Sequence, residues 1–394
     1  MQRPGLLERL ARAQAERAQL SLLRRLRTVD SVDGSRIVIG SRPLLNFASN
    51  DYLGLAQHPA LREALTRSAA RWGVGATASH LLGGHRDEHA ALEEKLAQWT
   101  GRERALLFST GYMANLGALG ALLRDGDVCV QDKLNHACLL DGARLSGAEL
   151  KRYAHADAGA AARQLHNMPD AAALLATDAV FSMDGDIAPL RELSALCKKS
   201  YATFMVDDAH GLGVLGPQGA GSLAEAGLGQ DDAPVLMATL GKALGVAGAF
   251  IAGSKGLIDG LVQFARTHTY TTAMPPALAA AASTAVDLAR SESWRHDRLR
   301  RLIAQWRGGA AQRGLPLLES RTPIQPLLVG ASEDALRISL QMENAGFYIP
   351  AIRPPTVPAG KARLRIALSA AHEEADIEAL LDELARVPAM GGAA

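Results

Sequence analysis

The middle of the chain alternates short apolar runs with amphipathic stretches, and this alternation limits the possible folds more than any other feature. Helical patterns cover residues 112–123, 136–145, 190–200 and 255–265, between the apolar runs. Strands separated by helices form βαβ units, so the sequence predicts an α/β fold with a mostly parallel sheet. The predicted strands are Ala105–Phe108, Val128–Val130, Leu174–Val180, Thr203–Val206, Val235–Thr239 and Gly248–Ala252.

A helix-rich stretch at Pro276–Leu302 follows these units, and the pattern changes within it, near Ser291–Arg301. We therefore predict a large α/β domain at residues 51–290 and a smaller α+β C-terminal domain at residues 291–394, after an N-terminal helical and strand segment at residues 1–50. In the tail we expect strands at Ile324–Val329, Gly346–Ile349 and Arg363–Ala367 and helices at Glu333–Ala345 and Glu373–Val387.

The charge balance and the cysteines exclude several classes of protein. The chain has 42 lysines and arginines against 41 aspartates and glutamates, a net charge of +1, so we expect no nucleic-acid partner. Three widely spaced cysteines predict neither a disulfide framework nor a cysteine zinc site and favour a cytoplasmic location.

The charged N-terminus has no signal-peptide core. Its leucines instead predict an amphipathic helix that packs on its own domain or on a partner subunit, and we expect no membrane partner.

A single charge, Lys242, interrupts the apolar stretch Ala233–Gly253. Glycines break this stretch, so we interpret it as two buried strands joined by a loop rather than as a transmembrane helix. Burial of an unpaired ammonium is costly and lowers its pKa. Lys242 is therefore either ion-paired or functional, and a Schiff base is the function that suits a partly neutral amine.

Two motifs match known functional patterns, but the sequence around each lacks the helix or the further ligand that the pattern requires. GLGVLG at Gly211–Gly216 matches a dinucleotide fingerprint, but the following PQGAG cannot form the helix that binds a pyrophosphate. His85, Glu88 and His89 match the inverted zincin pattern H-x-x-E-H, yet no third ligand is evident. We interpret the first motif as a loop and the second as a polar first helical turn, and predict no metal site.

Asp207 directly follows an apolar strand, with Asp208 next and His210 three residues later. Ligands of open α/β sheets bind at the carboxyl ends of strands, and a carboxylate there can hold a protonated ring nitrogen. Pyridoxal phosphate enzymes combine this pairing with a lysine Schiff base. A helix cap or a metal ligand is the alternative role for Asp207.

A phosphate seat and a stacking group complete this set. Gly111 and Tyr112 open a helical pattern after Phe108–Thr110, so backbone N–H groups there can bind a dianion. Thr239 offers a hydroxyl three residues before Lys242. His136 heads another helical pattern and can stack on a planar ring, act as an acid or simply cap the helix.

With these residues the chain resembles the α-oxoamine synthase family of fold-type I pyridoxal 5'-phosphate-dependent transferases. The resemblance extends over nearly the whole chain. It rests on NFASNDYLGL (Asn46–Leu55), STGYMAN (Ser109–Asn115), NHACLLDGARLS (Asn135–Ser146), FSMDGDIAPL (Phe181–Leu190), VDDAHGLGVLG (Val206–Gly216), TLGKALG (Thr239–Gly245) and IRPPTVPAGKARLRIALSAAH (Ile352–His372).

The resemblance implies a role for each matching residue. Lys242 forms the Schiff base and removes the Cα proton of the amino acid, while Asp207 binds the pyridinium nitrogen. His136 stacks on the ring, contacts substrate and donates a proton. The remaining cofactor-binding residues are Gly111, Tyr112, Ser182, Thr239 and His210, of which His210 bonds the phenolic oxygen. Arg365 is expected to bind the amino-acid carboxylate, and Arg24 and Thr356 the acyl substrate.

The last motif is closest to the biotin-pathway member of the family, which condenses L-alanine with a pimeloyl thioester of coenzyme A or a carrier protein. Glycine-using members, 5-aminolevulinate synthase and 2-amino-3-ketobutyrate ligase, are the alternatives. A nicotinamide-dependent oxidoreductase and a non-catalytic helical scaffold represent other classes. The family also implies a homodimer. The sequence departs from the family pattern at His80, His85, Tyr112 and Asp178.

Overall fold

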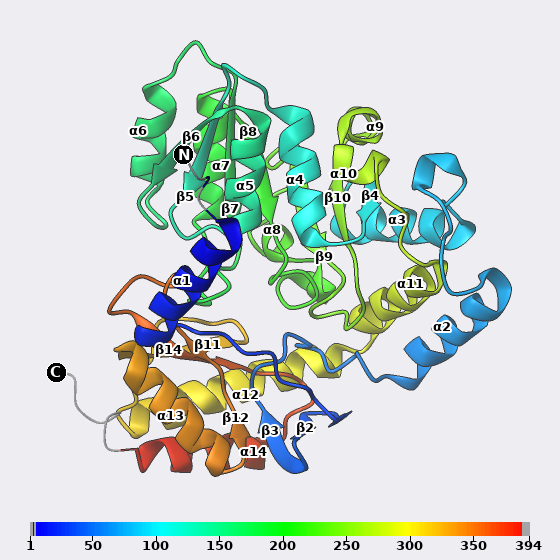
Figure 1. Cartoon of the computed structure of the whole chain (residues 1–394). Helices are drawn as coiled ribbons and strands as arrows, with labels where there is room; N and C mark the ends of the chain where they lie inside the picture. Colours follow the sequence, from blue (N-terminus) through cyan, green and yellow to red (C-terminus); the bar gives the residue numbers. More distant parts are fainter. Residues whose placement is uncertain (1–2, 4, 388–394) are drawn as a thin grey trace. The chain divides into compact units, whose positions relative to one another are not determined.

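The computed structural model describes residue 3 and residues 5–387, which form two compact units. One unit comprises residues 50–300. The other combines the described residues up to Ser49 with those from Arg301 onward. Helix α12 (Ser293–Gln312) crosses the boundary, so one continuous helix contributes to both units. Figure 1 labels the elements along the chain.

Residues 50–300 contain a seven-stranded sheet with the strand order β4-β10-β9-β8-β7-β5-β6. Neighbouring strands from β9 to β6 pair in parallel, whereas β10 runs antiparallel to both β4 and β9. The predicted mostly parallel sheet is confirmed, and β9 and β10 occupy the apolar stretch around Lys242. The strands are β4 Arg104–Phe108, β5 Val128–Asp132, β6 Glu149–Tyr153, β7 Ala173–Asp178, β8 Thr203–Asp207, β9 Val235–Thr239 and β10 Ala249–Gly253.

The sequence pattern missed strand β6, whose residues ELKRY include one buried side chain, Tyr153. An edge strand needs little apolar surface, because only one of its sides pairs with another strand. The pattern that identified the central strands is therefore missing here. Helix α6 (Ala158–His166), which packs on β5 and β6, was also not predicted.

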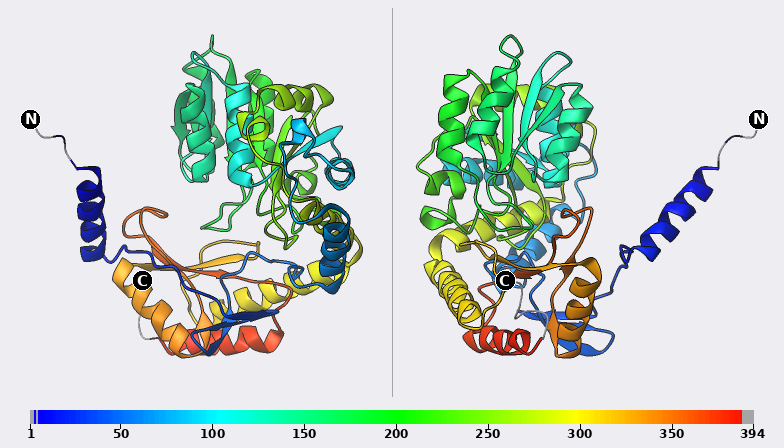
Figure 2. Two further views of the ribbon diagram at one scale, coloured as in Figure 1. Left: turned by 45° about the vertical axis from the view of Figure 1, so that its right-hand side comes forward. Right: turned by 90° about the vertical axis from the view of Figure 1, so that its left-hand side faces the viewer.

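Side chains alternate between the two faces of this sheet, and each face is covered by helices (Figure 2). Met205 of β8 packs in one core layer with α4 (Gly111–Leu122) and α5 (Ala137–Ser146). Its neighbours Phe204 and Val206 pack in the other layer, with α6 and α7 (Leu190–Lys199). Because strand side chains alternate with a period of two, Asp207 falls on the face of Met205.

The loops of this unit confirm two interpretations of the sequence. GLGVLG lies in the connection after β8, and the next α-helix, α8, has only four residues. The H-x-x-E-H motif overlaps the first turn of α3.

Among residue 3 and residues 5–387, no helix is both long and apolar enough to span a membrane. Helices not yet given are α2 Pro59–Trp72, α3 Asp87–Thr100, α8 Ser222–Glu225, α9 Lys255–Phe264, α10 Arg266–Thr269 and α11 Pro276–Ser291, with 3-10 turns at His80–Leu82 and Pro217–Gly219.

The second unit contains a four-stranded sheet, β1-β2-β3-β12, and a three-stranded sheet, β11-β14-β13. Strand β12 pairs in parallel with β3, so segments from opposite ends of the chain share one sheet. The elements predicted for the tail are confirmed. The strands are β1 Ser31–Asp33, β2 Arg36–Ile39, β3 Arg42–Asn46, β11 Ile324–Gly330, β12 Phe347–Tyr348, β13 Ala351–Ile352 and β14 Ala362–Ala367, and the remaining helices are α1 Leu6–Gln19, α13 Ser332–Asn344 and α14 Glu374–Ala385.

The predicted N-terminal amphipathic helix is α1, and none of its residues is buried within the chain. Its leucines are largely exposed, with 70% of Leu6, 81% of Leu7 and 67% of Leu10 accessible. Figure 2 shows the helix, in dark blue, projecting from the rest of its own unit. The helix was expected to pack on its own domain or on a partner subunit. The structure shows no packing of α1 on its own domain.

Candidate active site

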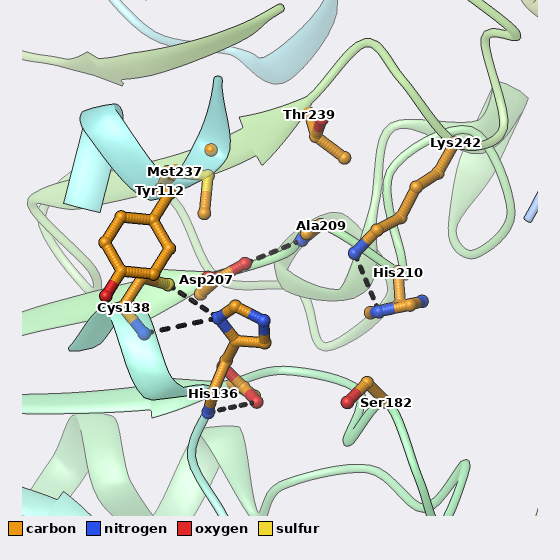
Figure 3. Close-up of a pocket in the computed structure, with 12 residues that line it drawn as sticks. Tyr112, His136, Cys138, Ser182, Asp207, Ala209, His210, Met237, Thr239 and Lys242 are labelled. Carbon is orange, nitrogen blue, oxygen red and sulfur yellow. Dashed lines mark hydrogen bonds between the residues drawn. The ribbon is translucent and has the colours of Figure 1, made fainter. Parts of the chain in front are cut away.

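A cavity of about 200 Å³ lies where β7, β8 and β9 end. The parallel ladder places Asp178 beside Asp207, and Asp207 beside Met237, so their side chains project from the same face. Figure 3 shows the side chains that surround this volume. All eight residues expected around the cofactor line it: Gly111, Tyr112, His136, Ser182, Asp207, His210, Thr239 and Lys242.

Asp207 is nearly buried, with 5% of the residue exposed, and two donors fix its carboxylate. Oδ2 accepts from the side-chain amide of Asn115 at 2.7 Å, and Oδ1 accepts from the backbone N–H of Ala209 at 3.0 Å. An ionised carboxylate offers about four acceptor positions. Further acceptor capacity is thus available to a cation or an N–H group in the cavity.

The adjacent carboxylate, Asp208, has a different role. Its oxygens accept from the backbone N–H and the hydroxyl of Ser222, at 2.7 and 2.5 Å. Burial raises the pKa of Asp208 to about 7. Asp208 joins the loop after β8 to the start of α8 and does not line the cavity.

Lys242 ends a chain of three hydrogen bonds. Its Nζ lies 2.7 Å from Nε2 of His210, and Nδ1 of His210 lies 2.7 Å from the hydroxyl of Tyr52. The single proton of that hydroxyl is directed at Oδ1 of Asn50, at 3.1 Å. The hydroxyl therefore accepts from Nδ1–H, which leaves Nε2 of His210 as an acceptor for the amine of Lys242.

His136 forms the N-cap of α5, and its ring is held in one tautomer. Nδ1 accepts from the backbone N–H of Cys138 at 3.3 Å and lies 2.8 Å from the Cys138 thiol. Because Nδ1 is an acceptor, the proton of the neutral ring is on Nε2. Burial lowers the pKa of His136, with an opposing effect from Asp207, so the neutral ring is favoured.

The first turn of α4 supplies the anion-binding groups. Thr110 caps the helix by accepting from the N–H of Met113 at 3.1 Å, and the first N–H groups of a helix have no partner within it. Such groups suit a phosphate. Tyr112, next to Gly111, has 43% of its surface exposed and donates its hydroxyl proton to Asp141.

Thr239 holds the loop that carries Lys242. Its hydroxyl donates to the carbonyl of Gly248 at 2.9 Å and accepts from the N–H of Gly241 at 3.2 Å. This side chain was expected to seat phosphate or cofactor. In the structure it lines the cavity, but its proton is already used within the loop.

Three of the four expected substrate residues, Arg24, Thr356 and Arg365, lie in the other unit, whereas His136 lines the first cavity. Nη2 of Arg24 donates to the hydroxyl of Thr356 at 2.8 Å, which brings together residues from the two ends of the chain. A cavity of about 220 Å³ adjoins them, and Arg353 lines it as well. Two guanidinium groups in one cavity suit an anionic ligand. Arg365 lies on β14 and is 5% exposed.

Sequence reasoning missed four side chains that shape the first cavity: Tyr52, Asn115, Cys138 and Asp178. Each stands in or beside a motif quoted for the family resemblance, but motif membership alone does not say what a residue contacts. Asn115 acts on Asp207 across 92 positions of sequence, and Tyr52 on His210 across 158. No local pattern could identify these pairs.

A second polar cluster in the same unit, the histidine cluster, consists of His80, His85, His89 and His268. Both nitrogens of His89 have partners, the N–H of Arg86 at 2.9 Å and the carbonyl of Met274 at 2.8 Å. His80 stacks on His268, and its Nδ1 lies 2.9 Å from Nδ1 of His85. Within residues 5–387 we find no group of three or more His, Cys, Asp or Glu side chains that could hold a metal ion.

Comparison with known proteins places the chain in a defined group. The family model for class I and II aminotransferases matches residues 42–384. The 8-amino-7-oxononanoate synthase of Pseudomonas putida (strain W619) is 54% identical over 376 residues, covering 95% of this chain and 96% of the relative. The synthase of Methylococcus capsulatus (strain Bath) is 56% identical over 359 residues, covering 91% and 93%.

Solved structures of two kinds of enzyme share the fold of the chain. Serine palmitoyltransferase of Sphingomonas wittichii superimposes with a TM-score of 0.92 at 29% identity, covering 97% of this chain and 98% of that one. A serine palmitoyltransferase from S. paucimobilis with a bound PLP–myriocin aldimine gives 0.93 at 28% identity, with the same coverage. The 8-amino-7-oxononanoate synthase of Francisella tularensis gives 0.77 at 28% identity, covering 87% and 97%.

Proposed function

The chain belongs to the aminotransferase class I and II family, and we propose that it acts as an 8-amino-7-oxononanoate synthase, a pyridoxal phosphate-dependent acyltransferase of biotin biosynthesis. The proposal rests on full-length similarity to proteins of that name. The structural observation that supports it most is the convergence of Lys242, Asp207 and His136 on one cavity. An amine, a carboxylate, a flat ring and a helix N-terminus match the groups of pyridoxal phosphate.

The reaction joins L-alanine to a pimeloyl thioester. A new bond forms between Cα of alanine and the acyl carbonyl carbon, and the thiol of coenzyme A or a carrier protein leaves. Carbon dioxide is lost from the former alanine carboxylate, which gives 8-amino-7-oxononanoate. The cofactor, when bound, withdraws electrons from Cα and stabilises the negative charge that develops there.

Lys242 and Asp207 divide the work at the cofactor. When the cofactor is bound, the Nζ of Lys242 would hold it through a Schiff base and, as a free amine, would take the proton from Cα of the amino acid. His210, whose Nε2 lies 2.7 Å from that Nζ, orients it. A proton on Nε2 would let His210, together with Ser182 of the cavity lining, bond the phenolic oxygen when the cofactor is bound. Asp207, whose carboxylate is fixed by Asn115 and the N–H of Ala209, would bind the ring nitrogen and favour its protonated form.

His136 supports the ring and can move a proton. With Nδ1 occupied by the Cys138 N–H, the Nε2 proton is the one available for donation to the substrate. The N–H groups of Gly111 and Tyr112 seat the phosphate. From the family resemblance we also assign Arg365 to the amino-acid carboxylate, and Arg24 with Thr356, which are hydrogen-bonded to each other, to the acyl substrate.

The proposal includes a homodimer in the cytoplasm. The exposed leucines of α1 favour a second subunit as the surface that covers this helix. The cysteines Cys129, Cys138 and Cys197 are free and buried, which is typical of proteins from reducing compartments. Sedimentation of the purified protein measures the oligomeric state directly.

Product identification tests the assignment. Purified protein with pyridoxal phosphate is offered alanine or glycine, each with pimeloyl-CoA, a pimeloyl carrier protein or succinyl-CoA, and the products are identified by mass spectrometry. We expect 8-amino-7-oxononanoate from alanine and a pimeloyl donor. A comparable kcat/KM for glycine with succinyl-CoA overturns the substrate assignment and leaves the family membership intact.

A further inference from the structure

Asp178 is the last residue of β7 and the direct register partner of Asp207 on β8. It is 5% exposed and lines the cavity. Its Oδ2 accepts from the backbone N–H of His136 at 3.0 Å. Its Oδ1 is buried and has no hydrogen-bond partner among the described residues. The mechanism above gives this carboxyl group no role.

Two carboxyl groups at paired positions of adjacent strands cannot both ionise cheaply in a buried site. Asp207 has two donors on its oxygens, the amide of Asn115 and the N–H of Ala209. Asp178 has one, the N–H of His136. The negative charge is therefore better stabilised on Asp207. Burial and the charge of Asp207 raise the pKa of Asp178 well above its usual range.

The other charged groups around Asp178 do not reverse this balance. Lys242 favours its ionised form, whereas Asp132 on the neighbouring strand β5 opposes it. Other groups stabilise the carboxylate of Asp132, because its oxygens accept from the N–H groups of Leu134 and Ala156 and lie beside His155. Lys242 itself already contacts His210.

We propose that Asp178 is a positioning residue that remains a neutral carboxylic acid, holding the backbone of His136 and leaving the negative charge of the site on Asp207 alone. The oxygen that accepts from His136 acts as the carbonyl oxygen, and the proton is on the unpartnered Oδ1. A neutral hydroxyl is less costly there than an unpaired anionic oxygen. Asp178 thus fixes the start of α5 without competing with Asp207 for the pyridinium proton.

The test compares the isosteric variants Asp178→Asn and Asp207→Asn in holoenzyme. This inference rests on the cofactor of the proposed function and not on its substrates, so the main measurement uses none. The visible absorbance of the cofactor joined to Lys242 changes as that linkage loses its proton. A nearby negative charge raises the midpoint of this titration, and removal of the charge lowers it.

For Asp178→Asn we expect a midpoint within about 0.3 pH unit of wild type, because a neutral group replaces a neutral group. For Asp207→Asn we expect a larger displacement, of about one unit or more, because the variant loses the carboxylate charge and with it the proton on the ring nitrogen. Asp178→Asn should lose only roughly three- to tenfold in kcat/KM, because the asparagine oxygen can still accept from the backbone N–H of His136. Asp178→Leu has no acceptor and should lose roughly a hundredfold.

A downward shift of a full unit in Asp178→Asn shows that Asp178 is ionised and overturns the proposal. Full activity in Asp178→Leu also overturns the proposal, because catalysis then does not depend on the hydrogen bond between Asp178 and the backbone N–H of His136. Where Asp178→Leu does not fold, Asp178→Ala replaces it, and the Asp178→Asn titration decides alone. A protein that shows the expected titration but no turnover with any acyl donor contradicts the proposed function and supports the role of Asp178.

Discussion

The active-site cavity and the histidine cluster are both polar and buried, lie in the same unit and contain similar residue types. They differ in what the side chains leave available. In the cavity, Lys242, Asp207 and His136 retain donor or acceptor capacity toward a volume of about 200 Å³. In the cluster, His89 directs both nitrogens at backbone atoms, and His80 lies between His85 and His268.

The difference shows that a high density of titratable residues does not by itself identify a site. Burial lowers the pKa of His80 to about 3 and of His85, His89 and His268 as well, so the cluster is a neutral, hydrogen-bonded core. In the cavity, opposite charges and capped helix ends face one volume. Substitutions in the two regions should therefore affect different properties, catalysis in the first and stability in the second.

The largest effect is expected from Lys242→Ala. Loss of the amine removes both the cofactor attachment and the base, so turnover should fall by more than about 10³-fold and the visible band of the linkage should disappear. Added alanine should still form a slow adduct with the cofactor. Borohydride reduction of the wild type should label the peptide that contains Lys242. Label on Lys133, Lys198 or Lys255 instead would place the site elsewhere.

The next effect distinguishes two adjacent carboxylates. Asp207→Asn removes the charge that pairs with the ring nitrogen, and kcat/KM should fall by roughly 10- to 100-fold while the cofactor still binds. Asp208→Asn is the matched control, because Asp208 contacts Ser222 outside the cavity. Stopped-flow absorbance with alanine measures both variants. If their behaviour is exchanged, Asp208 is the partner of the ring nitrogen.

A smaller effect is expected from Tyr52→Phe, which removes the hydroxyl that accepts from His210. Loss of one hydrogen bond of about 1 kcal/mol corresponds to roughly fivefold in kcat/KM. The pH midpoint of the cofactor absorbance should also move, because His210 contacts Lys242. Tyr201→Phe, at a residue that is 97% exposed, is the control. Equal values for both variants would show that the chain of hydrogen bonds ending at Lys242 does not tune its amine.

The smallest effect on catalysis, and a clear effect on stability, is expected in the histidine cluster. The pKa of His80 is lowered from 6.5 to about 3, so between these values the unfolded chain binds a proton that the native chain does not. Above pH 6.5 this group should therefore not lower the free energy of unfolding. As the pH falls from 6.5 toward 3, the free energy of unfolding should decrease by roughly 1.4 kcal/mol per pH unit because of this group.

His80→Gln should reduce that slope by about one proton and leave kcat/KM at neutral pH unchanged. Urea unfolding at a series of pH values measures it. A loss of turnover at neutral pH with unchanged slope would give the cluster a catalytic role and remove the contrast between the two regions.

Much of the fold could be predicted from the sequence, because the strands of the sheet interior need both faces apolar. The runs of β5, β7, β8, β9 and β10 are therefore visible one at a time. Lys242 and Asp207 could be identified because each breaks or ends such a run, and a charge at that place needs an explanation. Edge strand β6 and the exposed N-terminal strand β1 have no such requirement, so their patterns are weak.

The sequence by itself determined which residue types stand at the strand ends and, through the period of two, that Asp207 and Asp208 face opposite sides. The tertiary structure decided which side chains complete them. Asn115, Tyr52 and Asp178 act through contacts between segments distant in the chain, and those contacts exist only once helices and strands have packed. Side-chain chemistry and strand period are local properties, whereas the partner of a buried charge depends on the register and packing of the whole sheet.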